Sequence, residues 1–585
     1  MTPAVARVLP DLPAVDRVFD YDASQASPPA GIGDRVRVSL QGRSVRGWVV
    51  GVADRAERTG LKPLARRLGI GPPPSVVELC EWAAWRWAGP WSKLLSTASP
   101  PRVITKLPDG PPATSAPNVH NQLRVVGQRL VRQGAATLVR VGPCTDPIEL
   151  VLAMLHGVEA TGATGSLIVT TPTTAWAQRL AERLVHRGVN AVGPDHWAAA
   201  AAGFPVVVGA RAASLAPVPS LAAALVLDAH DGAYRQTQTP CWDAVTMLAE
   251  RCRRAGAPLV ATSWCPDPTL LALIRHVEET EHEARMWPRL VVADLSVADP
   301  RERQLSSTFA NAAHRALAEP GPGARVVVVL QRLGGTRLMS CRACGALAVC
   351  EPHGLALREG ALGYGCAAGC VEHPRLCVRC GATTLRVLRE GITSLTKRVS
   401  SLLGVEAVEV SAATKELDGD ARVVVGTEAV LTRVRHAGVV CFADLDDYLC
   451  APRAHGSLEA LRAIGLAGRI VGARGSNSPG SVVVQTRLAT HPAVVAAGRG
   501  EPAPLIAAEA AMARELGLPP HVALCSLRGA GAAVFASALA SSQITVSASA
   551  GGFLAVAPSH RELCDALAST PRPAEPLRVE VDPRE

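Results

Sequence analysis

Apolar and polar positions alternate in two different ways along this 585-residue chain. In residues 34–40 every second side chain is apolar, and residues 45–52 form a second, mostly apolar run after the polar turn 41–44. Such alternation is typical of half-buried antiparallel strands. The pattern predicts a small β-rich domain over residues 1–105, followed by a proline-rich linker over residues 106–121.

From residue 122 onward, short apolar runs alternate with longer helical stretches, which is typical of a doubly wound parallel sheet. The first series of runs predicts one α/β lobe over residues 122–284. A second series begins after residue 285 and resumes after a cysteine-rich segment, which we expect to interrupt the second lobe after its first strand. The expected boundaries are 285–336 and 391–488 for the second lobe, 337–390 for the insert, and 489–585 for a small C-terminal α+β domain.

The composition permits large cores and a polyanionic partner. The chain is 48% hydrophobic, and its net charge is +9 with only five lysines. Arginine forms bidentate contacts with phosphate, so this balance is compatible with nucleic acid. The alternative is a GC-rich genome that favours arginine codons. No long uncharged apolar run and no signal pattern occur, so we expect a cytoplasmic, nucleoid-associated protein without a membrane partner.

The cysteines indicate bound metal. Seven of the 16 cysteines fall between residues 341 and 380, and clustering of this kind in a cytosolic protein favours metal over disulfides. Cys341 and Cys344 form one C-x2-C pair, and Cys377 and Cys380 form another. Two such pairs complete a tetrahedral four-thiolate zinc site.

A second set of four ligands lies between these pairs. Cys350, His353, Cys366 and Cys370 complete a second site, which predicts two structural zinc ions in total. His373 competes with Cys370 for the last position, and the spacing leaves this choice open. Eight ligands for two ions leave no open coordination position for catalysis.

The turn at residues 141–147 links a predicted strand to a predicted helix, where nucleotide-driven motors hold phosphate. Such motors need a loop of backbone N–H groups, a lysine for the phosphates and a Ser/Thr for magnesium. This turn carries Gly142, Asp146 and Pro147 but no lysine, and no G-x-x-x-x-G-K-[ST] motif occurs in the chain. Asp146 suits a helix N-cap and Pro147 a first helical position. The sequence therefore predicts that the turn keeps its fold and no longer binds ATP with magnesium.

Two further positions where a motor needs functional residues have also lost one of them. Asp228 ends an apolar run as a magnesium-binding carboxylate would, but Ala229 stands where a water-activating glutamate is expected. Arg469 is present, but Gly472 stands where a second arginine is expected. Each position taken alone is also an ordinary strand-end or loop residue. The expected degenerate nucleotide site comprises Gly142, Asp146, Asp228, His230 and Arg469.

Four segments, at residues 15–22, 33–52, 206–236 and 517–524, together with the eight-ligand insert, resemble the bacterial PriA (primosomal protein N′) family. The resemblance covers nearly the whole chain and describes a form with degenerate helicase motifs. It implies two tandem RecA-like helicase lobes with a two-zinc insert in the second. The linker is too short for the winged-helix domain that many members carry.

The resemblance also implies a DNA site in the first domain. In this family the first domain holds the 3′ end of a nascent strand. By motif match, Phe19, Asp20, Gly42 and Lys62 are its residues here. An aromatic ring stacks on a base and a lysine pairs with phosphate. Phe19 has an equally ordinary interpretation as a core residue.

The implied function is replication restart. The chain would recognise stalled forks, promote primosome assembly and reload the replicative helicase without helicase activity of its own. Its expected partners are branched DNA, primosome and helicase-loading proteins, and single-stranded DNA-binding protein. One alternative is an enzyme, a slow 3′-5′ helicase with residual ATP binding. The other is a zinc-structured interaction scaffold with no DNA role.

Overall fold

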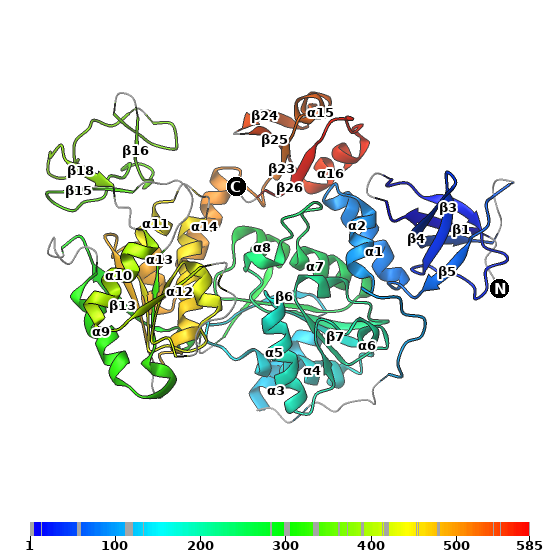
Figure 1. Cartoon of the computed structure of the whole chain (residues 1–585), viewed down its shortest axis with the longest axis horizontal. Coiled ribbons are helices and arrows are strands. Elements are labelled where there is room, and N and C mark those ends of the chain that lie inside the picture. Colours follow the sequence, from blue (N-terminus) through cyan, green and yellow to red (C-terminus); the bar gives the residue numbers. More distant parts are fainter. Residues whose placement is uncertain are drawn as a thin grey trace.

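The computed structural model places five groups of elements along the chain (Figure 1). No helix in the described part of the chain is long and apolar enough to cross a membrane. Most of the expected linker, at residues 111–116 and 118–120, lies outside the described residues. The structure describes residues 5–12, 15–54, 60–110, 117, 121–132, 134–280, 283–297, 305–330, 338–360, 363–370, 372–387, 391–411, 414, 420–451, 453, 455–476, 480–541, 543–549 and 551–583.

The first group is a five-stranded antiparallel sheet in the order β2-β1-β4-β3-β5. The backbone N–H of Asp22 donates to the Lys62 carbonyl at 2.9 Å, and Leu64 N–H donates to the Asp22 carbonyl at 2.8 Å. These bonds join β2 to the segment before β5 and close the sheet into a small barrel. The strands are β1 (Val5–Pro10), β2 (Phe19–Asp22), β3 (Arg35–Leu40), β4 (Arg43–Ala53) and β5 (Arg66–Gly69).

Two helices, α1 (Pro74–Arg86) and α2 (Trp91–Ala98), connect the barrel to the rest of the molecule. Trp48 on the outer face of the barrel and Trp87 after α1 are each 2% exposed. Both belong to one apolar core that continues through the first lobe into the C-terminal domain. Trp87 is therefore a core residue at this junction.

Lobe 1 contains a seven-stranded parallel sheet in the order β12-β6-β11-β10-β7-β9-β8. Its central strands are buried on both faces, as expected for a parallel sheet covered by helices. The strands are β6 (Ala136–Arg140), β7 (Ser166–Thr170), β8 (Ala191–Val192), β9 (Val206–Gly209), β10 (Leu221–Val226), β11 (Leu259–Ser263) and β12 (His276–Glu279). The helices are α3 (Asn121–Arg132), α4 (Pro147–Thr161), α5 (Thr174–His186), α6 (Trp197–Ala201), α7 (Ala244–Ala255) and α8 (Pro268–Leu273).

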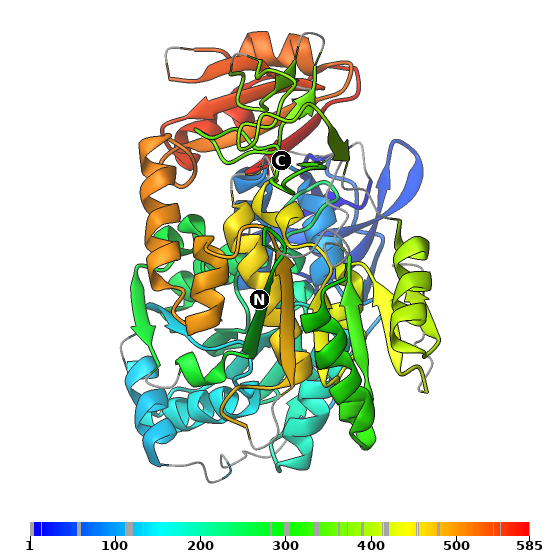
Figure 2. The same ribbon diagram turned by 90° about the vertical axis from the view of Figure 1, so that its left-hand side faces the viewer.

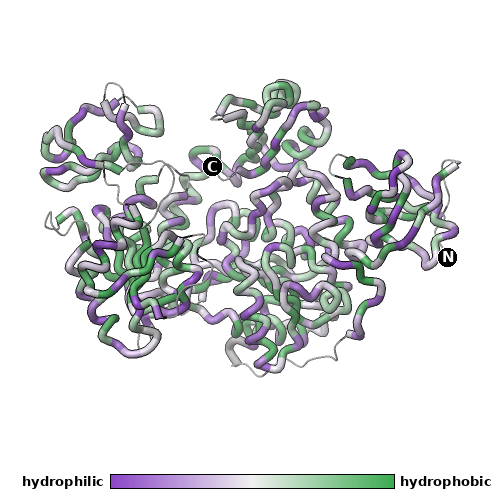
Figure 3. The backbone as a smooth tube through the Cα atoms, in the orientation of Figure 1, coloured by the Kyte–Doolittle hydropathy of each residue, from purple (hydrophilic) through white to green (hydrophobic). Residues whose placement is uncertain are grey.

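Lobe 2 contains a six-stranded parallel sheet in the order β13-β22-β21-β14-β20-β19. Figure 3 shows the apolar residues concentrated in these strands. The strands are β13 (Arg289–Asp294), β14 (Val326–Val329), β19 (Ala407–Val410), β20 (Val423–Gly426), β21 (Val439–Phe442) and β22 (Ser481–Thr486). The helices are α9 (Ser307–Ala318), α10 (Ile392–Leu403), α11 (Asp446–Leu449), α12 (Gly456–Val471), α13 (Pro492–Arg499) and α14 (Ala503–Glu515).

Two features of lobe 2 differ from the sequence prediction. The insert follows the second strand of the lobe, β14, and not its first, because β13 pairs in parallel with β22. The prediction missed β13 because it is an edge strand with mixed exposure, so its apolar pattern is weak. The expected boundary at 489 also separates α13 and α14 from lobe 2, whereas Val494 and Leu505 pack into its core.

The cysteine-rich insert and the C-terminal domain lie on the same side of the two lobes in both views (Figures 1 and 2). The insert is built from short strands, while the C-terminal domain has an antiparallel sheet in the order β24-β25-β23-β26. The insert strands are β15 (Met339–Cys341), β16 (Arg358–Glu359), β17 (Tyr364–Gly365) and β18 (Leu385–Val387). The C-terminal elements are β23 (Ala523–Arg528), α15 (Ala532–Leu539), β24 (Thr545–Ser549), β25 (Gly552–Ala557), α16 (His560–Ser569) and β26 (Arg578–Val581).

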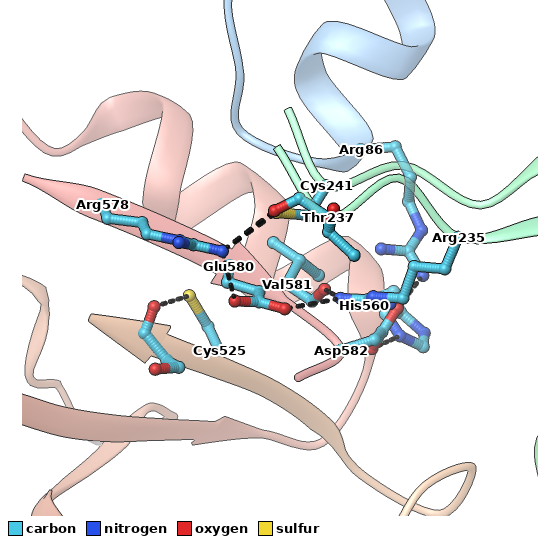
Figure 4. A network of polar contacts seen from close by, with 11 residues as sticks. Arg86, Arg235, Thr237, Cys241, Cys525, His560, Arg578, Glu580, Val581 and Asp582 are labelled. Carbon is cyan, nitrogen blue, oxygen red and sulfur yellow. Dashed lines mark hydrogen bonds and ion pairs between the residues drawn. The ribbon is translucent and has the colours of Figure 1, made fainter. Parts of the chain in front are cut away.

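Polar contacts fix the C-terminal domain to lobe 1 and to α1 (Figure 4). Arg235 of lobe 1 donates to the Val581 carbonyl at 2.7 Å. Arg86 of α1 pairs with Asp582 at 2.8 Å, and His560 contacts the other oxygen of the same carboxylate at 2.7 Å. Arg86 of α1 and Arg235 of lobe 1 thus bind neighbouring residues, Asp582 and Val581, of the C-terminal domain.

Candidate functional site

The turn between β6 and α4 folds as the sequence predicts. Asp146 is the N-cap of α4, since its side chain accepts a hydrogen bond from the Ile148 N–H at 3.1 Å, and Pro147 begins the helix. The other Asp146 oxygen accepts from Arg183 on α5 at 2.7 Å. The predicted N-cap is confirmed, and the carboxylate charge at the helix start disfavours an anion there.

The N–H groups of this turn are largely engaged within the protein. Cys144 N–H donates to the Met286 carbonyl at 3.0 Å, and Thr145 N–H donates to the Gly142 carbonyl at 3.1 Å. A side chain at Gly142 would lie 2.4 Å from Met286 Cβ, so the turn packs directly on residues 283–286. A phosphate-binding loop needs several free N–H groups that point to one centre, and Pro143 and Pro147 supply none.

Arg469 of α12 in lobe 2 reaches across to this turn. Its guanidinium forms a two-pronged ion pair with Asp228, which follows β10 in lobe 1, with one N–O distance of 2.8 Å. The Nε of Arg469 donates to the Pro143 carbonyl at 2.7 Å. The guanidinium carbon also lies 4.9 Å from the Trp176 ring centre and 4.6 Å from that of Trp264. One arginine thus links the turn, the strand-end carboxylate and two aromatic rings.

The environment of Asp228 is dry. Asp228 is 2% exposed and its φ of 54° lies in the left-handed region. Burial raises the pKa of its carboxyl group, and the charge of Arg469 opposes this rise. His230 is also buried, with Nδ1 at 2.8 Å from Ser263 Oγ, and burial holds its pKa well below the ordinary value. His230 is therefore neutral at pH 7.

The interface between the lobes is tightly packed beside this ion pair. Trp264 follows β11 in lobe 1 and is fully buried in the core of lobe 2. A side chain at Gly465 of α12 would lie 2.5 Å from Trp264 Nε1, so only glycine permits this approach. Arg462 of α12 also pairs with Asp267 of lobe 1 at 3.2 Å.

The structure brings the expected nucleotide residues together and adds partners that the sequence prediction missed. Trp176, Trp264, Arg183 and the Pro143 carbonyl were not expected at this site. Single tryptophans after a strand or at a helix start give no local pattern that marks them. The only available signal was their position after apolar runs, at the carboxyl edge of a parallel sheet.

The outer cysteine set forms a compact cluster in the insert. Cys341 Sγ lies 3.6 Å from Cys380 Sγ, and Cys344 Sγ lies 3.6 Å from Cys377 Sγ. All four sulfur atoms lie within 4.8 Å of one another. Zn–S bonds of about 2.3 Å in a tetrahedron put sulfur atoms about 3.8 Å apart, so the set fits a metal ion of that size.

The inner set forms a second cluster that could hold a metal ion. His353 Nδ1 lies 3.1 Å from Cys370 Sγ and 3.4 Å from Cys350 Sγ, and Cys366 completes the group. His373 lies outside the group, and its backbone pairs with Tyr364 in a short antiparallel bridge. The geometry therefore favours Cys370 over His373 as the fourth ligand.

The four expected DNA residues lie on the N-terminal barrel. Phe19 and Asp20 are in β2, and the exposed Lys62 lies beside this strand through its carbonyl bond to Asp22 N–H. Phe19 is partly buried against the barrel core. Gly42, with a φ of 79°, lies in the turn of the β3–β4 hairpin. The structure thus groups Phe19, Asp20 and Lys62 where β2 meets the segment before β5, a place here called the barrel seam.

Comparisons with known proteins agree with this arrangement. Residues 7–100 match the family model described as the 3'DNA-binding domain (3'BD) of PriA. The chain is 27% identical over 350 residues to replication restart protein PriA of Treponema pallidum, covering 54% of this chain and 51% of that protein. It is 27% identical over 588 residues to the probable replication restart protein PriA of Mycobacterium tuberculosis, covering 88% of this chain and 85% of that protein.

A third relative, replication restart protein PriA of Synechocystis sp., is 25% identical over 445 residues. The match spans 64% of this chain and 52% of that protein, so the chain covers about half the length of two of these three relatives. A solved DEAD box protein from Methanococcus jannaschii has a TM-score of 0.30 at 10% identity and bears on neither fold nor function. On the barrel match and the relatives together, the chain is similar to replication restart proteins of the PriA family over most of its length.

Proposed function

We propose that this protein binds stalled replication forks through an exposed 3′ end and promotes primosome assembly without acting as a motor. The names of its relatives and the barrel match support the DNA role. Its protein partners would be primosome and helicase-loading proteins, with single-stranded DNA-binding protein as a further partner. The proposed units are the barrel, two helicase-like lobes, a zinc insert and the C-terminal domain.

The ion pair between Arg469 and Asp228 carries the proposal that the lobes are not a motor. In working motors a strand-end carboxylate holds magnesium and an arginine stabilises the charge on the transferred phosphate. Here these two groups neutralise each other, so neither presents its charge to a nucleotide. The carboxylate of Asp146 also lies at the helix start where phosphates would bind.

The absence of each catalytic group would slow ATP hydrolysis strongly. Removing a single donor that stabilises a developing charge typically costs a factor of about 10² to 10³ in rate. This chain has no lysine at the turn, and Ala229 follows Asp228 where a water-activating glutamate is expected. A residual ATP-driven helicase is the remaining alternative, and the ion pair disfavours it.

Two zinc ions would hold the insert together. The outer set Cys341, Cys344, Cys377 and Cys380 and the inner set Cys350, His353, Cys366 and Cys370 are the proposed ligands. The insert has only a small apolar core of its own, so metal binding would supply most of its folding free energy.

The experiment is to measure ATP hydrolysis and fork binding side by side on the purified full chain. We expect tight, salt-sensitive fork binding, no hydrolysis stimulated by DNA, and no rise in melting temperature with MgATP, because a ligand that binds the native state would raise it. Hydrolysis at the rate of motor helicases would overturn the scaffold proposal. Failure to bind any fork would overturn the DNA role.

A further inference from the structure

The outer face of the barrel carries a row of arginines across three neighbouring strands. Arg37 in β3 lies directly opposite Arg46 in β4 and opposite Arg66 in β5. Directly opposed residues of antiparallel strands point to the same face, so the three side chains form one row, here called the arginine row. All three are exposed, whereas Val36 and Val38 on either side of Arg37 are buried in the barrel.

The arginine row lowers the stability of the barrel sheet when no anionic partner is bound. Like charges directly opposite each other destabilise a sheet, and within the described residues the structure records no ion pair or hydrogen bond for these three side chains. Arg35, next to the row, donates to the Pro100 carbonyl at 3.2 Å. Burial lowers the pKa of Arg35, the charge of Arg46 lowers it further, and Asp11 opposes them as the nearby carboxylate.

Overall composition does not account for this row. Strands β3, β4 and β5 contain six arginines and no acidic residue. The whole chain, in contrast, has 60 basic and 51 acidic residues. A surface that concentrates unopposed guanidinium groups is complementary to a phosphate backbone, which arginine contacts through two parallel hydrogen bonds.

The arginine row begins close to the proposed 3′-end site. Lys62 lies at the barrel seam beside β2. Arg66, the first member of the row, follows Lys62 along the chain at the start of β5. From Arg66 the row crosses to Arg37 and then to Arg46, at a strand spacing of about 4.8 Å per step. Cations thus continue from the seam around the outside of the barrel, which is at one end of the molecule (Figure 1).

We propose that the arginine row binds the phosphate backbone of the duplex arm whose 3′ end lies at the barrel seam. This inference rests on the proposed DNA function and extends it from the strand end to the arm behind it. Phosphate contacts of this kind fix position without reading sequence. The repulsion within the row is relieved when the phosphates are bound.

The test compares the full-length protein with its triple variant Arg37→Gln, Arg46→Gln, Arg66→Gln on labelled forks. We expect the variant to bind a fork with a paired nascent arm at least about tenfold more weakly at roughly 50 mM salt. Its log–log salt slope should be shallower by about two to three, at about 0.9 per lost contact. Its preference for a 3′-hydroxyl over a 3′-phosphate should persist, and it should match wild type on a fork that lacks the duplex arm.

A matched control removes three exposed arginines elsewhere, Arg124→Gln, Arg132→Gln and Arg315→Gln on α3 and α9, and should bind as wild type. Without DNA, the melting temperature of the arginine-row variant should equal or exceed that of wild type. Binding equal to wild type or to the control, or an equal loss on forks without the arm, would overturn the inference alone. If the wild-type protein bound no fork, the proposed function would fail together with the inference.

Discussion

Arg469 and Asp228 are 241 residues apart in sequence and form a two-pronged ion pair between the two lobes. The pair is asymmetric, because the Asp228 side chain is 3% exposed and the Arg469 side chain is 27% exposed. A buried carboxylate depends on its partner far more than a surface carboxylate does. The pair that we propose disables the nucleotide site therefore also links the two lobes.

Arg469→Ala should destabilise the protein. The substitution leaves Asp228 buried without a partner, which typically costs about 3–5 kcal/mol of unfolding free energy. Chemical denaturation of the full chain measures this loss. Arg453→Ala is the matched control, because Arg453 forms a partly exposed ion pair with Glu459, also in lobe 2. Loss of that pair should cost no more than about 1 kcal/mol of unfolding free energy. Equal losses in the two variants would contradict the role assigned to Arg469.

His230 should make the protein less stable in acid. Its folded-state pKa lies well below the ordinary value because it is buried, and Arg462 and Arg469 add repulsion. Below an unfolded pKa of about 6.5, only the unfolded chain takes up this proton, so the unfolding free energy falls as the pH drops. The contribution is at most about 1.4 kcal/mol per pH unit.

Denaturation of wild type and His230→Gln between pH 7 and 5 tests this dependence. The variant should show a shallower loss of stability over that range, whatever its stability at pH 7. Other titrating groups are common to both proteins and cancel in the comparison. Parallel pH profiles for the two proteins would show that His230 does not contribute.

The sequence predicted local features of the site well and distant ones poorly. The N-cap at Asp146 follows from an Asp-Pro pair before a helix, a rule that acts within one turn. The contact between Trp264 and Gly465 depends on how two lobes pack, and no local pattern encodes it. Strand β13 was missed for a related reason, since an edge strand shows its role only through its partner β22. The choice between Cys370 and His373 also needed three-dimensional positions.

The metal content should be two zinc ions per chain. Cys370→Ser should lose one ion, because Cys370 lies 3.1 Å from His353 in the inner cluster, whereas His373→Gln should keep both. Cys144→Ser is a control outside both clusters and should also keep two. Metal analysis of the purified variants provides the count. Loss of an ion from His373→Gln, with none lost from Cys370→Ser, would reverse the ligand assignment.

Phe19 and Lys62 should contribute differently to recognition of the 3′ end. Phe19 is partly buried beside the barrel seam, and stacking of one base on an aromatic ring is worth about 1–3 kcal/mol. Phe19→Ala should therefore weaken the preference for a paired 3′-hydroxyl more than it weakens duplex binding. Lys62 is exposed, so Lys62→Ala should weaken binding to all forks and flatten the salt slope by about one contact.

Fluorescence anisotropy on matched forks with a 3′-hydroxyl or a 3′-phosphate separates these two effects. Lys397→Ala on α10 is the matched control, since Lys397 is exposed and belongs to lobe 2 and not to the barrel. A melting curve for Phe19→Ala tests whether the ring serves only the core, in which case stability falls and end preference stays. If both forks bound equally to wild type and Phe19→Ala changed nothing, the seam would not be an end-binding site. The barrel would then bind duplex DNA through phosphate contacts alone.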